Sequence, residues 1–91
     1  MQKSYESIQM GHALTILGRV YAVPGSAMLH SRARAAAIRL MIGDYVRALA
    51  LCAEVEAMLR DVPSEQLGED FATLREILAT LVEREDELRA A

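Results

Sequence analysis

The chain has 91 residues, of which 53% are hydrophobic and 25% charged, and its net charge is −3. These values are typical of one small globular domain and exclude an intrinsically disordered chain. Aromatic residues make up 4% and tryptophan is absent, so the core must be aliphatic, which favours a helical bundle over a β-sandwich or barrel. We therefore expect an all-α fold, a compact four-helix domain that spans residues 1–91.

The two halves of the chain differ in charge. Residues 1–50 carry six basic and two acidic side chains, whereas residues 51–91 carry four basic and eleven acidic ones. Opposite charges allow the halves to attract one another within the fold, or to present two different surfaces to partners. The chain also lacks a signal-peptide pattern and any apolar run of membrane-spanning length, and its single cysteine, Cys52, cannot form an intramolecular disulfide. These features predict a cytoplasmic protein that does not enter a membrane.

The first helix is predicted over residues 4–22, with Ser4 as its N-cap. Its apolar residues recur at helical spacing and form a face broad enough for more than one neighbour. Gly11 and Gly18 lie in a strip of small residues along the same helix, although each glycine costs a helix about 1 kcal/mol relative to alanine. The strip therefore predicts that another helix approaches closely, either from within the domain or from a partner.

The second and third helices are predicted over residues 27–42 and 44–62. Pro24 and Gly25 break the chain before the second helix, Gly43 ends it, and Asp44 caps the third. We expect the third helix to be central and the most buried. The residues predicted to face inward from these two helices are Leu29, Ala33, Ala36, Ala37, Leu40 and Met41, followed by Tyr45, Ala48, Leu49, Cys52, Val55 and Leu59.

The fourth helix is predicted over residues 64–89, capped by Ser64, with Gly68 placing the start of its regular part near Glu69. Its apolar residues follow a spacing of 4, 3, 4, 3, which is typical of a coiled-coil-like seam. The seam consists of Leu67, Phe71, Leu74, Leu78 and Leu81, and the register resumes at Leu88. We expect these leucines to be buried, either within the domain or between two copies of the chain.

Residues that could carry chemistry are scattered. His12 and His30 are eighteen residues apart without cysteine or acidic residues at metal-ligand spacing, and no glycine-rich phosphate-binding loop is present. The sequence therefore predicts no metal, no cofactor and no enzymatic activity. Arginines form the one basic cluster, but without interleaved aromatic residues and at a pI of about 5.3 they make nucleic-acid binding the weaker interpretation. The cluster consists of Arg32, Arg34, Arg39 and Arg47.

The segment GDYVRALAL, residues 43–51, resembles the junction of a tetratricopeptide repeat, a helix–turn–helix unit of 34 residues. The resemblance rests on Gly43, Asp44 and Tyr45, with the small residue Ala48 following. It implies that the second and third helices form an antiparallel hairpin, with the first helix packed on one side of it and the fourth on the other. Small chaperones of type III secretion have domains of this kind. The segment EQLGEDFATL, residues 65–74, is similar to a stretch of flagellar export chaperones. Both resemblances imply that the protein holds an amphipathic helix of a partner.

The sequence thus predicts a non-enzymatic interaction module, a chaperone or adaptor that binds a partner helix against its first and second helices. A homodimer built on the seam of the fourth helix is the alternative, and a nucleic-acid-binding regulator that uses the arginine cluster comes third. The residues predicted to contact the partner helix are Gly11, Leu14, Leu17, Gly18 and Tyr21, with Arg32 and Arg39 at the rim.

Overall fold

The structure, a computed structural model, describes residues 5–20, 23, 27–60 and 65–90. Within these residues the chain forms four helices and no strand, which confirms the predicted all-α, four-helix architecture. The helices are α1 (Tyr5–Val20), α2 (Ala27–Met41), α3 (Tyr45–Met58) and α4 (Glu65–Ala90). No helix in the described part of the chain combines the length and the apolar character needed to cross a bilayer.

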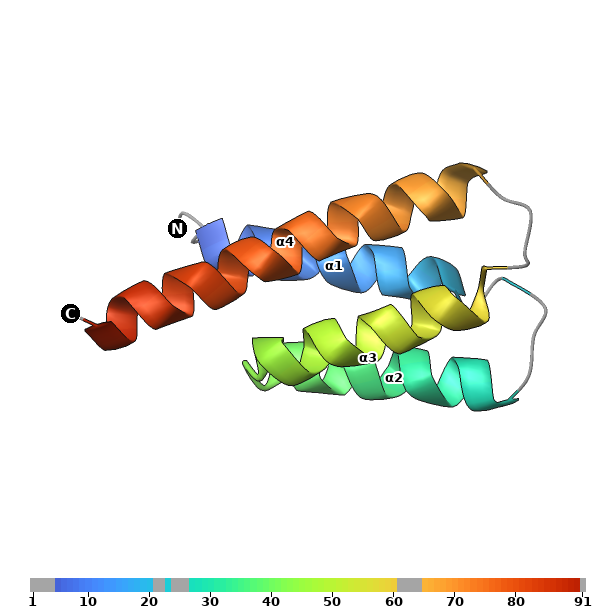
Figure 1. Cartoon of the computed structure of the whole chain (residues 1–91), viewed down its shortest axis with the longest axis horizontal. Coiled ribbons are helices and arrows are strands. Elements are labelled where there is room, and N and C mark those ends of the chain that lie inside the picture. The colour runs from blue at the N-terminus through green and yellow to red at the C-terminus, as the bar shows by residue number, and fades with distance from the viewer. Residues whose placement is uncertain (1–4, 21–22, 24–26, 61–64, 91) are drawn as a thin grey trace.

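Consecutive helices run in opposite directions and lie side by side (Figure 1). α4 closes the ring by packing against α1, while α1 and α3, like α2 and α4, lie diagonally across the bundle. The prediction that the third helix is central was therefore wrong. Short connections place consecutive helices next to each other, so each of the four contributes one face to a shared core. α2 and α3 form the most extensive contact of the four.

The helix ends differ from the prediction mainly at the end of α3, which was predicted to reach residue 62. α3 ends at Met58, and the amide of Leu59 then donates to the carbonyls of Val55 and Glu56, which tightens the final turn. α4 begins at Glu65, one residue from the predicted start, and its regular part includes Gly68 and so begins before Glu69. Burial of Leu67 next to this glycine offsets its helix penalty of about 1 kcal/mol. The predicted caps Ser4 and Ser64 lie outside the described residues.

The turn between α2 and α3 has the geometry that its sequence predicts. Gly43 adopts a φ of 85°, the left-handed conformation that glycine accepts without steric cost. The amide of Gly43 donates to the carbonyl of Leu40 and the amide of Asp44 to that of Arg39, which is the Schellman arrangement for ending a helix. The Asp44 carboxylate then accepts from the backbone amide of Arg47 and caps α3.

The core is aliphatic and includes the whole predicted seam of α4, from Leu67 to Leu81. In α2, two of the residues predicted to face inward do not do so completely: Ala37 is half-buried and Met41 is 56% exposed. Met41 follows the fully buried Leu40, and one residue turns the helix by about 100°, which carries the methionine away from the core. The buried residues of α2 and α3 are Leu29, Ala33, Ala36, Leu40, Tyr45, Ala48, Cys52 and Val55.

Candidate partner-binding surfaces

One of the main residues of the predicted groove on α1 is buried in the core and is not available to a partner. Leu17 is 1% exposed and packs among Ala13, Ile16 and Val20. It therefore stabilises the bundle and offers no surface to a partner, contrary to the prediction. Leu14 is half-buried against the core, which leaves part of its side chain accessible. Tyr21 lies outside the described residues.

The glycine strip of α1 faces solvent. Gly11 and Gly18 are exposed, and a Cβ atom added to either would meet no neighbouring atom within 4 Å. Neither glycine is therefore required for close packing of another helix within the bundle, which was one of the two roles predicted for the strip. Thr15, between the two glycines, donates its hydroxyl to the carbonyl of Gly11.

The two arginines predicted at the rim of that groove lie on the other side of α2. Arg39 approaches the carboxylate of Asp44 at the start of α3, with 3.6 Å between Nη1 and Oδ2. Arg32 is seven residues from Arg39, or about two turns, and so shares its side of the helix. The ring of His30, by contrast, lies 3.2 Å from the carbonyl of Val23, just after α1. Because Arg32 is about 200° around the helix from His30, the arginines flank α3 and not α1. The structure does not bring the predicted site together.

A different concave surface lies between α3 and α4, where a hollow of about 390 Å³ opens to solvent. Its floor is apolar and consists of the buried side chains of Leu59, Leu67 and Phe71. Its edges carry small residues from both helices. These edge residues are Ala53 and Ala57 of α3 and Gly68 of α4. A Cβ atom added to Gly68 would meet nothing within 4 Å, so the hollow is open at that position.

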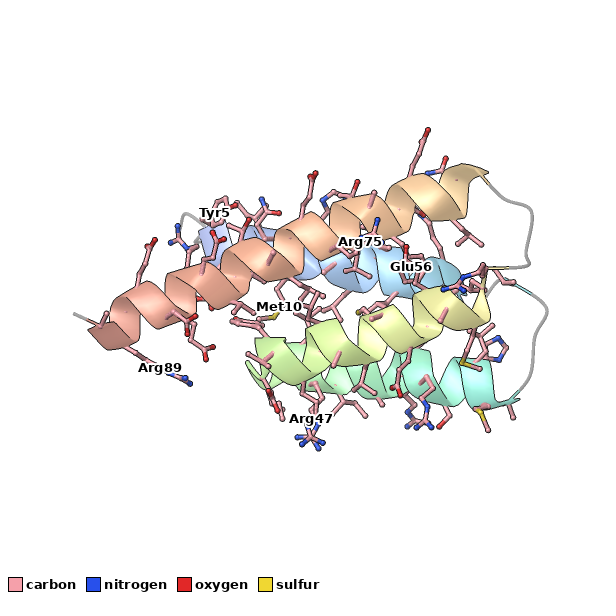
Figure 2. The ribbon with its side chains drawn as sticks, in the orientation of Figure 1. Tyr5, Met10, Arg47, Glu56, Arg75 and Arg89 are labelled. Atoms are coloured by element: carbon pink, nitrogen blue, oxygen red, sulfur yellow. The ribbon has the colours of Figure 1, made fainter. Side chains whose placement is uncertain are left out.

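Charged side chains border the same hollow. The guanidinium of Arg75 on α4 contacts both carboxylate oxygens of Glu56 on α3 at 2.7 Å, and Figure 2 shows the two side chains pointing toward one another. Arg60, at the end of α3, is exposed and forms no ion pair with another described residue. Among the described residues that line the hollow, two are cations and one is an anion, so this border favours an acidic ligand. A smaller hollow of about 270 Å³, between α1 and α4, is lined mainly by polar side chains.

Reactive groups within the described residues are few. Cys52 is buried in the core, and burial, assisted by the charge of Glu56, raises the pKa of its thiol to about 12. A thiol that stays protonated at neutral pH is a poor nucleophile, so Cys52 acts as a small apolar side chain. No three His, Cys, Asp or Glu side chains of the described segments lie close enough together to hold a metal ion.

Sequence reasoning missed the hollow between α3 and α4, although part of its signal was present. Ala53 and Ala57 are four residues apart and so lie on one side of α3, away from the apolar stripe. Gly68 was assigned to a helix start when it lies opposite these alanines across the hollow. Only the pairing of α3 with α4 joins these small residues, which are distant in sequence, into one surface.

Comparisons with known proteins add no assignment: no protein-family model matches the chain, and neither a curated protein nor a solved structure matches it.

Proposed function

We propose that the chain is a non-enzymatic protein–protein interaction module that holds an amphipathic helix of a partner protein in the hollow between α3 and α4. The observation that supports this is the combination of an apolar floor with edges of small side chains on both helices. Helix-in-groove recognition needs a groove of this kind, because the large apolar side chains of the incoming helix must reach the floor.

The small edge residues determine which ligand shape fits. Ala53, Ala57 and Gly68 project little from their helices, so the backbone of an incoming helix can approach α3 and α4 closely. A third helix laid between them would cover Leu59, Leu67 and Phe71 with its own apolar side. The hollow thus replaces the α1–α2 surface as the proposed site of partner binding.

The charges at the border indicate the polarity of the partner. Arg60 forms no ion pair among the described residues, so an acidic side chain of the partner would gain a contact there without breaking an existing pair. Border charges mainly affect association rate and salt dependence, while the apolar floor contributes most of the affinity. The partner is therefore proposed to be an acidic amphipathic helix. A cytoplasmic chaperone or adaptor role of the type III secretion kind belongs to the same proposal, and rests only on the resemblances of residues 43–51 and 65–74.

The test compares two exposed helical glycines, Gly68 at the hollow and Gly18 on α1. A phage library of acidic amphipathic helical peptides is selected on the immobilised chain, and the recovered peptides are titrated against variants by fluorescence anisotropy. Gly68→Leu fills the hollow and is expected to weaken binding by at least about tenfold. Gly18→Leu, whose Cβ also meets nothing within 4 Å, is the matched control and should leave affinity unchanged.

Both variants should remain folded, because each replaces a glycine in an exposed helical position and gains up to about 1 kcal/mol of helix propensity. Ala57→Arg, on the opposite edge of the hollow, is expected to reduce binding in the same way. If Gly18→Leu abolishes binding and Gly68→Leu does not, the partner uses α1 as the sequence predicted. If the library yields no peptide that binds the folded chain, the proposal is wrong.

A further inference from the structure

The seam of α4 continues past the core. Leu74, Leu81 and Leu88 are spaced seven residues apart, so they lie on nearly the same side of the helix. Leu74 and Leu81 are buried, but Leu88 is 77% exposed. About two turns beyond Leu81, the side of α4 that packs into the bundle therefore carries one more apolar residue, Leu88. No described part of the chain covers it.

The reason is a difference in helix length. α4 has 26 residues and α3 has 14. At 1.5 Å per residue they measure about 39 and 21 Å. In Figure 1 the C-terminal part of α4 reaches beyond the turn that joins α2 to α3. From Glu83 to Ala90 the helix contains no fully buried residue. We call these eight residues the α4 end.

Exposed apolar residues gather at the same end of the bundle. α1 begins there, α2 and α3 turn there and α4 ends there (Figure 1). Met28 near the start of α2 and Met58 at the end of α3 belong to the opposite ends of their helices. Large exposed apolar residues concentrated in one region are typical of a protein–protein contact. Those at this end of the bundle are Tyr5, Ile8, Ile38, Met41, Ile42, Val46 and Leu88.

Opposite charges lie on the two structural elements that meet there. The α4 end carries four acidic and two basic side chains, a net charge of −2, whereas residues 39–47 around the α2–α3 turn carry Arg39, Arg47 and Asp44, a net charge of +1. Arg47 forms no ion pair with another described residue, nor does Glu87. Figure 2 shows Arg47 pointing away from the bundle.

We propose that two copies of the chain associate through this end of the bundle, with the α4 end of each copy lying against the α2–α3 turn of the other. Leu88 would then contact exposed apolar residues of the partner's turn, such as Ile42 and Val46. Glu87, about 100° around α4 from Leu88, would face Arg47 of the second copy's α3. This proposal uses a different surface from the hollow between α3 and α4 and does not depend on it.

The occupant is a second copy because the surface complements itself. Each copy supplies one acidic, Leu88-bearing helix end and one basic, apolar turn, and a two-fold axis pairs them twice in one closed dimer. A partner of another kind would need only one of these two elements, and would leave the other exposed at the same end. Because the charged groups are exposed, the dimer should weaken as salt rises.

Charge reversal tests the pairing directly by sedimentation velocity at two salt concentrations. The turn variant is Arg47→Glu, and the end variant is Glu87→Arg. Each variant alone places like charges against like and should be monomeric at concentrations where the wild type is dimeric. An equimolar mixture restores both sets of opposite contacts and should form a heterodimer, with an affinity at least about tenfold above that of either variant for itself.

Leu88→Asp should also weaken the wild-type dimer at least about tenfold. Met28→Asp, at an exposed methionine toward the opposite end of the bundle, is the matched control and should leave it unchanged. A wild-type chain that stays monomeric up to about 200 µM contradicts the proposal, because the dissociation constant of the dimer would then be too high for a stable complex. So does a dimer that resists Leu88→Asp, or a mixture of the two charge variants that stays monomeric. Gly68→Leu should dimerise normally, which separates this result from the test of the hollow.

Discussion

The α2–α3 pair and the α1–α4 pair are both antiparallel in the bundle, but they are held together differently. Where α2 meets α3, the contact contains the fully buried alanines Ala33, Ala36 and Ala48, whose small side chains allow the backbones to approach closely. Where α1 meets α4, polar groups contribute: Arg19 contacts Asp70, and the guanidinium carbon of Arg84 lies 4.7 Å from the centre of the Tyr5 ring.

The comparison indicates that the two pairs should fail for different reasons. The α2–α3 contact has no room for added volume, while its charged residues lie at the surface. The α4 side combines large apolar residues with the buried carboxylate of Asp70, whose Oδ1 accepts from Arg19 at 2.7 Å and from Gln66 at 3.1 Å. Its other oxygen, Oδ2, has no hydrogen-bond partner among the described residues. The stability of the α2–α3 contact should therefore depend on side-chain volume. The stability of the α1–α4 contact should depend on both volume and charge.

The largest effect is expected from removing volume on α4. Leu78 is fully buried, so Leu78→Ala should leave a cavity and lower the free energy of unfolding by about 2–5 kcal/mol. Urea denaturation monitored by circular dichroism measures the loss. Leu88→Ala, on the exposed end of the same helix, is the control and should change stability by less than about 0.5 kcal/mol in the monomer. A loss as small for Leu78→Ala would mean that the seam is not enclosed.

Adding volume to the α2–α3 contact should have the next largest effect. Ala48 is fully buried, and Ala48→Leu should overpack the contact and cost about 1–3 kcal/mol. Ala50→Leu places the same side chain on an exposed position of the same helix and should be nearly neutral. Equal denaturant midpoints for wild type and Ala48→Leu would show that these two helices do not require small residues at their contact.

The charge contribution to the α1–α4 contact can be isolated with a double-mutant cycle. Arg19→Met leaves the Asp70 carboxylate buried without its cation and should cost about 1–2 kcal/mol, limited because the arginine itself is 48% exposed. Replacing both residues, by Arg19→Met with Asp70→Leu, should recover part of this loss because no unpaired charge remains. If the double variant loses as much stability as Arg19→Met and Asp70→Leu lose together, or more, the pair does not act as a unit.

The smallest effect concerns the link between the two pairs. The hydroxyl of Tyr45 on α3 donates to Glu6 on α1 at 2.5 Å, so Tyr45→Phe should cost about 1 kcal/mol. Burial, and then this hydrogen bond and the negative charge of Glu6, raise the pKa of Tyr45 from 10.0 to about 12.

A pKa raised by folding favours the protonated tyrosine in the folded state. The contribution of Tyr45 is therefore complete below pH 10 and is lost as the pH rises toward about 12. Between these values stability should fall less steeply in Tyr45→Phe than in the wild type. Absorbance at about 295 nm, a wavelength at which tyrosinate ionisation is followed, should show that the transition near pH 12 is absent in Tyr45→Phe. A transition near pH 12 that persists in Tyr45→Phe would contradict the assignment.

Much of the fold was predictable because it depends on local signals. Gly43 and Asp44 determine where α2 ends and α3 begins, since a left-handed glycine and an acidic cap act within a few residues. The spacing of Leu74, Leu78 and Leu81 likewise predicted their burial. By contrast, the end of α3 was misplaced: the helix ends at Met58, where the amide of Leu59 donates to the carbonyls of both Val55 and Glu56, and not at residue 62.

The candidate site was not predictable in the same way. Leu17 and Leu14 have the same character in sequence, yet one is buried and the other half-exposed. Arg32 and Arg39 could have faced either neighbour of α2, and only the contacts of His30 and Asp44 distinguish the two sides. When a helix has a broad apolar face, its sequence does not predict which part of that face the neighbouring helices cover.

The sequence by itself determined four helices, the turn at Gly43 and the buried seam of α4, because periodicity and capping are properties of the local chain. The tertiary structure alone decided the order of the helices around the core, the exposure of Gly11 and Gly18, and the hollow that joins Ala57 to Gly68. It also left Leu88 beyond the bundle, since α4 is longer than the helices it packs against. These features depend on which surfaces of different helices meet, and that is settled by the packing of the whole chain.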